Sequence, residues 1–191
     1  MNRVVRWMFS VCLSCLCLSS LSVARAQDRN LELIAATYGN NIERARQLIE
    51  LGADVNAKDQ LQNSAYLLAG ARGYIEILRM TLNAGADLKS LNRFGGTALI
   101  PACHYGHIET VRELLKTPVD VNHVNNLGWT ALMEAVILGD GGKTHTDIVR
   151  LLLDARANPN IADRDGVTPL AHAKRLRYRE MIVALEKAGG K

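Results

Sequence analysis

The sequence predicts an all-α solenoid, built from stacked helix-turn-helix units that are joined by β-turn loops. The first observation is a set of hydroxyl residues that recur at a step of 33 residues and then once at 38: Ser64, Thr97, Thr130 and Thr168. The second is an acidic residue near the end of three copies, again at a step of 33: Asp54, Asp87 and Asp120. A helical pair of this length cannot bury both of its faces, so neighbouring copies must stack and cover one another.

We expect five copies, at about residues 30–60, 61–93, 94–126, 127–164 and 165–190. Each should hold a β-turn, a first helix, a tight turn, a second helix and a loop to the next copy. Small residues share one position of the first helix, where neighbouring helices approach closely: Ala36, Ala69, Ala102, Ala135 and Ala173. Larger apolar residues three positions earlier should fill the core: Leu33, Tyr66, Leu99, Leu132 and Leu170.

The ends of the helices should need a left-handed residue. After the first helix the equivalent residues are Asn40, Gly73, Gly106, Gly139 and Arg177. Arginine adopts positive φ at a cost of about 1 kcal/mol, so strain is expected in the last copy. After the second helix glycine recurs, but Pro118 and Arg156 interrupt the series in the third and fourth copies, and proline cannot adopt positive φ. The third copy must therefore end that helix differently. Arg179 and Glu186 replace apolar residues in the last copy, as a water-facing cap requires.

The first 26 residues are typical of a signal peptide. Arg3 and Arg6 precede a largely apolar run at 8–21, and small residues at 24–26 suit a signal peptidase. The alternative is a retained membrane anchor, although the run is short and contains four serines. Cleavage after Ala26 leaves 27–191 as the folded domain, with Cys103 as its one thiol and no internal disulfide.

The charge of the predicted mature chain is close to neutral. The whole sequence carries a net charge of +4, but three arginines leave with the signal peptide, so that 20 basic residues face 19 acidic ones. Nucleic acid and anionic membranes are bound mainly through clustered excess cations. We therefore expect neither partner.

Short motifs in the copies resemble those of the ankyrin repeat family. They are TAL at 97–99 and 130–132, TPL at 168–170, GH at 106–107 and GADVN at 52–56. The family's usual histidine after TPL is replaced by Leu67, Ile100, Met133 and Ala171, which questions local hydrogen bonding and not the fold. Residues 139–170 are similar to small exported bacterial ankyrin proteins. That resemblance implies a helper of an exported enzyme or a neutraliser of a toxin.

Nucleotide binding, metal binding and catalysis are each supported less well by the residues than binding to a partner protein. The fourth copy carries an insert from Asp140 to Thr144 with the letters GGKT, but Ile137 stands where a phosphate-binding loop needs glycine. Cys103, His104 and His107 include metal-ligand types, yet no fourth ligand is visible. Histidines are scattered without the nucleophile and orienting group that catalysis requires. We expect no catalytic residue, no metal and no cofactor, and a flexible loop at the insert.

The face made by the β-turn tips and the exposed side of the first helices is the predicted binding surface. Aromatic and arginine side chains dominate binding energy near the centre of an interface. The candidate residues on this face are Arg93, Phe94, His104, Tyr105, Leu127 and Trp129. The alternative for Trp129 is simple packing on the next turn.

The sequence therefore predicts a monomeric, non-catalytic protein that binds another protein through its concave face in the bacterial periplasm. It is expected to assist or protect an exported enzyme. The alternatives are a toxin-neutralising protein, a secreted effector that imitates host proteins, and a metal-binding or redox accessory.

Overall fold

The computed structural model describes residues 25–191, and every regular element in that range is a helix. The predicted all-α class is confirmed. Almost all of the predicted signal peptide lies outside the described residues. Its proposed cut, after Ala26, falls at the start of a helical segment that covers residues 25–38.

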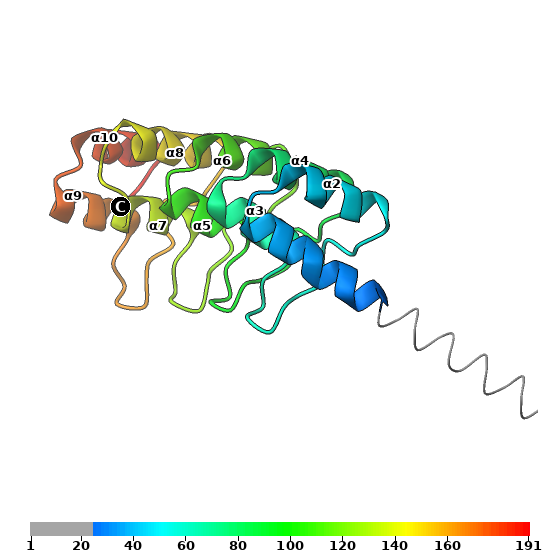
Figure 1. Ribbon diagram of the computed structural model, residues 1–191. Coiled ribbons are helices and arrows are strands. Elements are labelled where there is room, and N and C mark those ends of the chain that lie inside the picture. Colours follow the sequence, from blue (N-terminus) through cyan, green and yellow to red (C-terminus); the bar gives the residue numbers. More distant parts are fainter. Residues whose placement is uncertain (1–24) are drawn as a thin grey trace, which may run out of the picture.

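The helices form two parallel layers. The helical segment 25–38 is followed by α2 (Ile42–Glu50), α3 (Ala65–Arg72), α4 (Ile75–Asn83), α5 (Leu99–His104), α6 (Ile108–Leu115), α7 (Ala131–Ile137), α8 (Lys143–Asp154), α9 (Pro169–Leu176) and α10 (Arg179–Lys187). Figure 1 shows the first helices α3, α5, α7 and α9 in one row and the second helices in the other. Long loops project from the side of the first helices, and we call them fingers.

The core lies between the layers and between neighbouring copies. All five residues of the alanine series and all five of the larger apolar series are buried, as predicted. Neighbouring copies approach closely at α3, where a Cβ atom placed on Gly70 would lie 2.8 Å from the Cβ of Ala98, the residue before α5. The small residues therefore set how tightly the first helices stack.

The first helices begin at a capping hydroxyl, with one exception. Ser64, Thr130 and Thr168 each accept a hydrogen bond from the amide three residues later. Thr97 does not, because α5 begins only at Leu99 and the Thr97 hydroxyl is buried without a partner. Pro101 accounts for the later start of α5, since it has no N–H to donate to the Thr97 carbonyl.

The left-handed residues that end the first helices agree with the prediction except in the fourth copy. Positive φ occurs as expected at Asn40, Gly73 and Gly106, and Arg177 has a φ of 63°. The expectation that Gly139 is left-handed is wrong, because Gly141, with a φ of 70°, takes that conformation in the fourth copy. The insert moves the turn two residues along the chain.

The insert is also more ordered than a flexible loop. Its last two residues form the start of α8, which has 12 residues where the other second helices have eight or nine. The Asp140 carboxylate accepts hydrogen bonds from the Gly142 amide and from Nδ1 of His145, both at 2.9 Å, and these bonds lower the pKa of Asp140. Nε2 of His145 lies 3.0 Å from the carbonyl of His104 in the third copy. The insert thus ties the fourth copy to the third.

The last copy has the exposed outer surface that a cap needs. Arg179 and Glu186 are both exposed, and Glu186 pairs with Lys174 at 2.9 Å. The third copy ends α6 with Lys116 in a right-handed conformation, so Pro118 is accommodated without positive φ. Within residues 25–191, none of the helices has the length and apolar character needed to cross a membrane.

Candidate functional site

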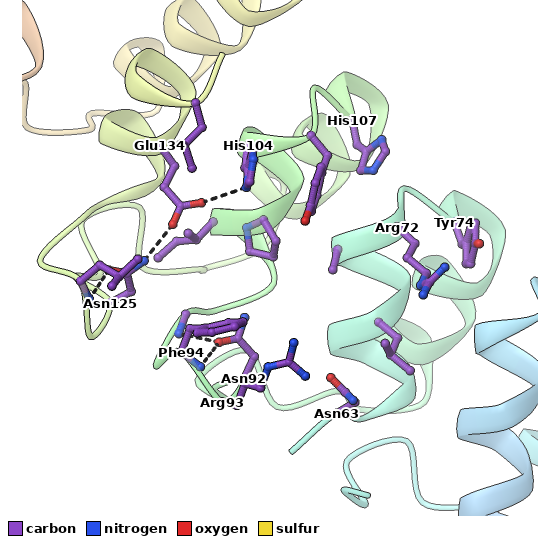
Figure 2. A pocket seen from close by; sticks show the side chains of 18 of the residues that line it. Asn63, Arg72, Tyr74, Asn92, Arg93, Phe94, His104, His107, Asn125 and Glu134 are labelled. Atoms are coloured by element: carbon purple, nitrogen blue, oxygen red, sulfur yellow. Dashed lines mark hydrogen bonds and ion pairs between the residues drawn. The ribbon is translucent and has the colours of Figure 1, made fainter. Parts of the chain in front are cut away.

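A groove of about 840 Å³ runs between the fingers and the first helices of the first four copies. Figure 2 shows its wall of aromatic, amide and charged side chains. The residues that line it are Tyr38, Asn63, Leu68, Ala71, Arg72, Tyr74, Asn92, Arg93, Phe94, Gly96, Ile100, Pro101, His104, Tyr105, His107, Asn125, Leu127, Glu134 and Leu138.

Each finger is shaped by one aspartate or asparagine side chain. In all four fingers its Oδ1 accepts hydrogen bonds from the amides two and four residues further, at 2.8–3.0 Å. The residues are Asp59, Asn92, Asn125 and Asp163. This closed turn holds three apolar side chains at successive finger tips, about half exposed: Leu61, Phe94 and Leu127.

The finger that carries Phe94 is also held by its neighbour. The backbone N–H of Asn126 donates a hydrogen bond to the Phe94 carbonyl at 2.9 Å. Gly95, with a φ of 71°, lies so close to Asn126 that an added Cβ would come within 2.4 Å of the Asn126 Oδ1 atom. Glycine adopts this conformation without strain, and a larger residue would also have to displace the Asn126 side chain.

Five of the six residues predicted for partner binding line the groove together. They are Arg93, Phe94, His104, Tyr105 and Leu127. Phe94 is 52% exposed and Tyr105 is 60% exposed, so two exposed rings lie in one concavity, as is typical of interaction sites. The structure places Trp129 half-buried at the base of its finger and outside the groove lining.

Stacked contacts fix the orientation of several groove side chains. The ring of His104 stacks on that of Tyr105 with centroids 4.2 Å apart. The Arg93 guanidinium lies over the Phe94 ring at 4.7 Å, and the Arg72 guanidinium lies over the Tyr38 ring at 5.2 Å. Cations over aromatic faces are held by the quadrupole of the ring.

A buried carboxyl group forms part of the groove floor in the fourth copy. Glu134, on α7, is 6% exposed, and its Oε1 accepts a hydrogen bond from Nδ2 of Asn125 at 2.9 Å. Its Oε2 lies 3.8 Å from Nδ1 of His104, which is beyond hydrogen-bond distance. Burial raises the pKa of Glu134 to about 7, and burial with the nearby His145 lowers the pKa of His104. Both shifts favour neutral forms, so the two side chains make a weak pair.

The groove offers polar anchors and stacking surfaces more than reactive groups. Cys103, the nearest thiol, is fully buried, and burial raises its pKa well above the ordinary value. Within the described range, no three His, Cys, Asp or Glu side chains are placed to share a metal ion. An apolar concavity with a few placed polar groups is suited to binding.

Sequence reasoning missed Tyr38, Tyr74, Asn125 and Glu134 as groove residues. Asn63, Arg72 and Leu138 line the groove as well. Glu134 did leave a signal, because it is the one charged residue in the apolar stretch 131–138. The hydrogen bond between Glu134 and Asn125 gives no signal in the sequence, because Asn125 lies on the finger nine residues earlier.

Comparison with protein families identifies the repeats. A family model of three ankyrin repeats matches residues 65–163 and again 123–189, and a single ankyrin repeat model matches residues 32–60. A curated relative is the ankyrin repeat protein YahD of Escherichia coli K12, 41% identical over 56 residues. That match spans 29% of this chain and 28% of YahD.

Two crystal structures resemble most of the chain. An ankyrin repeat domain from Acinetobacter baumannii AYE is 64% identical, with a TM-score of 0.82, and the match covers 83% of this chain and 81% of that one. The ankyrin repeat protein EF0377 is 41% identical, with a TM-score of 0.79, and the match covers 81% and 79% of the two chains.

Proposed function

From the premise that this chain belongs to the ankyrin repeat family, whose repeats are generally non-catalytic protein–protein interaction modules, we propose that its groove binds a partner protein. The protein acts by binding alone and carries out no reaction. The proposed surface is made of Arg93, Phe94, His104, Tyr105 and Leu127, with Trp129 at its edge.

The exposure of Phe94 and Tyr105 is the observation that carries the proposal. Two large rings are 52% and 60% exposed, and they line one concavity near the middle of the array. Interface energy concentrates in aromatic and arginine side chains at the centre of the contact. Arg93, which lies over Phe94, adds the cationic partner of this kind.

Partner capture by the tagged full chain tests the proposal. The chain is expressed in the cells that encode it, cross-linked and purified, and bound proteins are identified and quantified. Replacing Phe94 and Tyr105 together by alanine should reduce the captured partner tenfold or more, since each buried anchor contributes about 2 kcal/mol or more. Both side chains are exposed, so helical content and the melting temperature should stay nearly unchanged.

A matched control removes exposed apolar groups elsewhere. Leu51 and Val183 are 59% and 64% exposed and lie outside the groove. Replacing both by alanine should leave capture intact. Capture that survives in the Phe94 and Tyr105 variant would reject the groove as the binding surface. Trp129→Ala then measures whether the surface extends beyond the groove.

Export to the bacterial periplasm is a second part of the proposal. It rests on Arg3 and Arg6, the apolar run at 8–21 and the small residues at 24–26. N-terminal sequencing of the chain recovered from a periplasmic fraction should begin at Gln27. A chain found in the cytoplasm with its first residues intact would reject export.

The role in the periplasm is proposed as assistance to an exported enzyme, with toxin neutralisation and effector activity as alternatives. The identity of the captured protein separates them, because an enzyme, a toxin and a host protein differ in kind. A partner found only in host cells, with the chain in the medium, would favour the effector. The metal or redox accessory predicts metal bound to purified protein at a fixed ratio.

A further inference from the structure

One carboxylate oxygen on the groove floor accepts no hydrogen bond from the residues that the structure describes. Oε1 of Glu134 accepts a hydrogen bond from Asn125, whereas Oε2 lies 3.8 Å from Nδ1 of His104, beyond hydrogen-bond distance. Glu134 is 6% exposed and lines the groove. A buried carboxylate is stabilised by further donors, most strongly by charged ones. A cation that enters the groove could supply what the protein itself does not.

The other end of the groove carries positive charge. Arg72 and Arg93 are both exposed, and their guanidinium groups lie over the rings of Tyr38 and Phe94. Among residues 25–191 neither arginine forms an ion pair. Figure 2 shows Arg72 and Glu134 on opposite sides of the groove, with Arg93 between them. The groove therefore has a buried carboxyl group in the fourth copy, whose carboxylate form a bound cation would favour, and cationic guanidinium groups in the second and third copies.

The spacing of the repeats gives the distance between the two ends of the groove. Arg72 ends α3 and Glu134 lies on α7, with α5 packed between them. Packed helices are about 8–10 Å apart, so two steps span about 16–20 Å. An extended chain covers this in about five or six residues, and the single step from Arg93 in about three.

Resting on the proposed function, we propose that the groove holds an extended segment of the partner protein with a lysine or arginine at Glu134 and an aspartate or glutamate at Arg72 and Arg93. The two charged residues are about three to six positions apart. Apolar side chains between them lie on Phe94 and Tyr105. Charge complementarity sets which way round the segment lies.

Defined peptides test this inference without knowledge of the partner. The probes are fluorescent, acetylated 12-residue peptides with one lysine and one aspartate, placed two to nine positions apart on a leucine, alanine and serine background. Matched probes replace lysine by norleucine or aspartate by asparagine. The full chain should bind best at separations of three to six, and each neutral replacement should weaken binding about tenfold or more, as expected for a charged hydrogen bond.

Variants assign each charge to its residue. Glu134→Gln keeps an oxygen for Asn125, and it should remove the preference for lysine over norleucine while keeping that for aspartate. Replacing Arg72 and Arg93 by glutamine should do the reverse. Glu109→Gln is the matched control, because Glu109 is an exposed carboxylate on α6, outside the groove.

The possible outcomes separate this inference from the proposed function. Binding that ignores both charges, or a lysine preference that survives Glu134→Gln, overturns the inference while leaving the groove as a binding surface. A lack of binding to every probe also overturns it, and the capture experiment then decides the proposed function alone. Self-association that Glu134→Gln abolishes would assign the groove to a second copy of the chain and equally overturn the inference.

Discussion

The fourth and fifth copies use the same pair of positions in opposite ways. In the fifth copy the finger residue is Asp163 and the helix residue is His172, and the two pair at 2.7 Å. In the fourth copy the same positions hold Asn125 and Glu134, and the amide of Asn125 satisfies only one carboxylate oxygen. The hydrogen bond from His172 lowers the pKa of Asp163, whereas burial raises that of Glu134 to about 7. The same two positions therefore hold a hydrogen-bonded pair in the fifth copy and, in the fourth, a carboxyl group with one oxygen that faces the groove without a hydrogen bond from Asn125.

The largest expected effect comes from placing a second carboxyl group in the fourth copy. Asn125→Asp removes the amide donor and sets two carboxyl groups against each other, where Asn125 and Glu134 are now 2.9 Å apart. We expect a loss of about 2–4 kcal/mol in the free energy of unfolding at pH 8. The loss should be smaller at pH 5, since the folded pair then holds a shared proton. Urea denaturation at the two pH values measures it.

Asp163→Asn is the matched change in the fifth copy. The Oδ1 atom can still accept the two finger amides, so only the hydrogen bond between the carboxylate and His172 is lost. Because the folded pKa of Asp163 is lowered, its contribution is present above the ordinary carboxyl pKa and disappears as pH falls through the folded value. The deficit of the variant should therefore shrink in acid. Equal losses at all pH values in both variants would contradict the comparison.

A smaller effect is expected from Glu134→Gln on stability. The folded pKa of about 7 lies above the ordinary value of 4.5, so wild-type stability falls as pH rises between these values. At pH 8 the variant should be more stable than the wild type by about 1–3 kcal/mol, and the advantage should vanish near pH 5. The titratable side chains that face Glu134, His104 and Cys103, both favour their neutral forms. Thermal melts across this range check the trend, with Glu109→Gln as the control without a pH trend.

The smallest effect is expected at the end of α9. Arg177 has a φ of 63°, where the earlier copies use asparagine or glycine. Arg177→Gly should stabilise the chain by about 0.5–1 kcal/mol, which corresponds to a rise of about 1–4 °C in Tm. Arg175→Gly, inside the helix, should instead lower Tm. A decrease in both variants would show that the cap tolerates Arg177 without strain.

Much of the fold was predictable because repetition reveals register. The alanine and larger apolar series needed only the 33-residue step, and all of their members are buried. The left-handed arginine in the fifth copy followed from the same alignment. The 33-residue spacing does not predict the structure of the fourth copy, which contains the insert. There the left-handed residue is Gly141 and not Gly139, and part of the insert is helical.

The groove was less predictable because its polar contacts are specific to single copies. Register places Phe94 and Tyr105 on one face, but it does not show that Glu134 receives a hydrogen bond from Asn125 or that Tyr38 lies under Arg72. Each contact joins two residues of different types, and no other copy has the same combination at the equivalent positions. Pro101 is a further example, since this single residue delays the start of α5.

The backbone N–H of Asn126 donates a hydrogen bond to the Phe94 carbonyl. This finger tip is therefore already held in place before a partner arrives. Ordering a loose loop during association consumes conformational entropy and slows the final fit. A tip that is already preorganised avoids that loss, so the free and occupied shapes of this finger should nearly coincide. The rate of association would then be governed by the diffusional encounter with the partner, not by rearrangement of the protein.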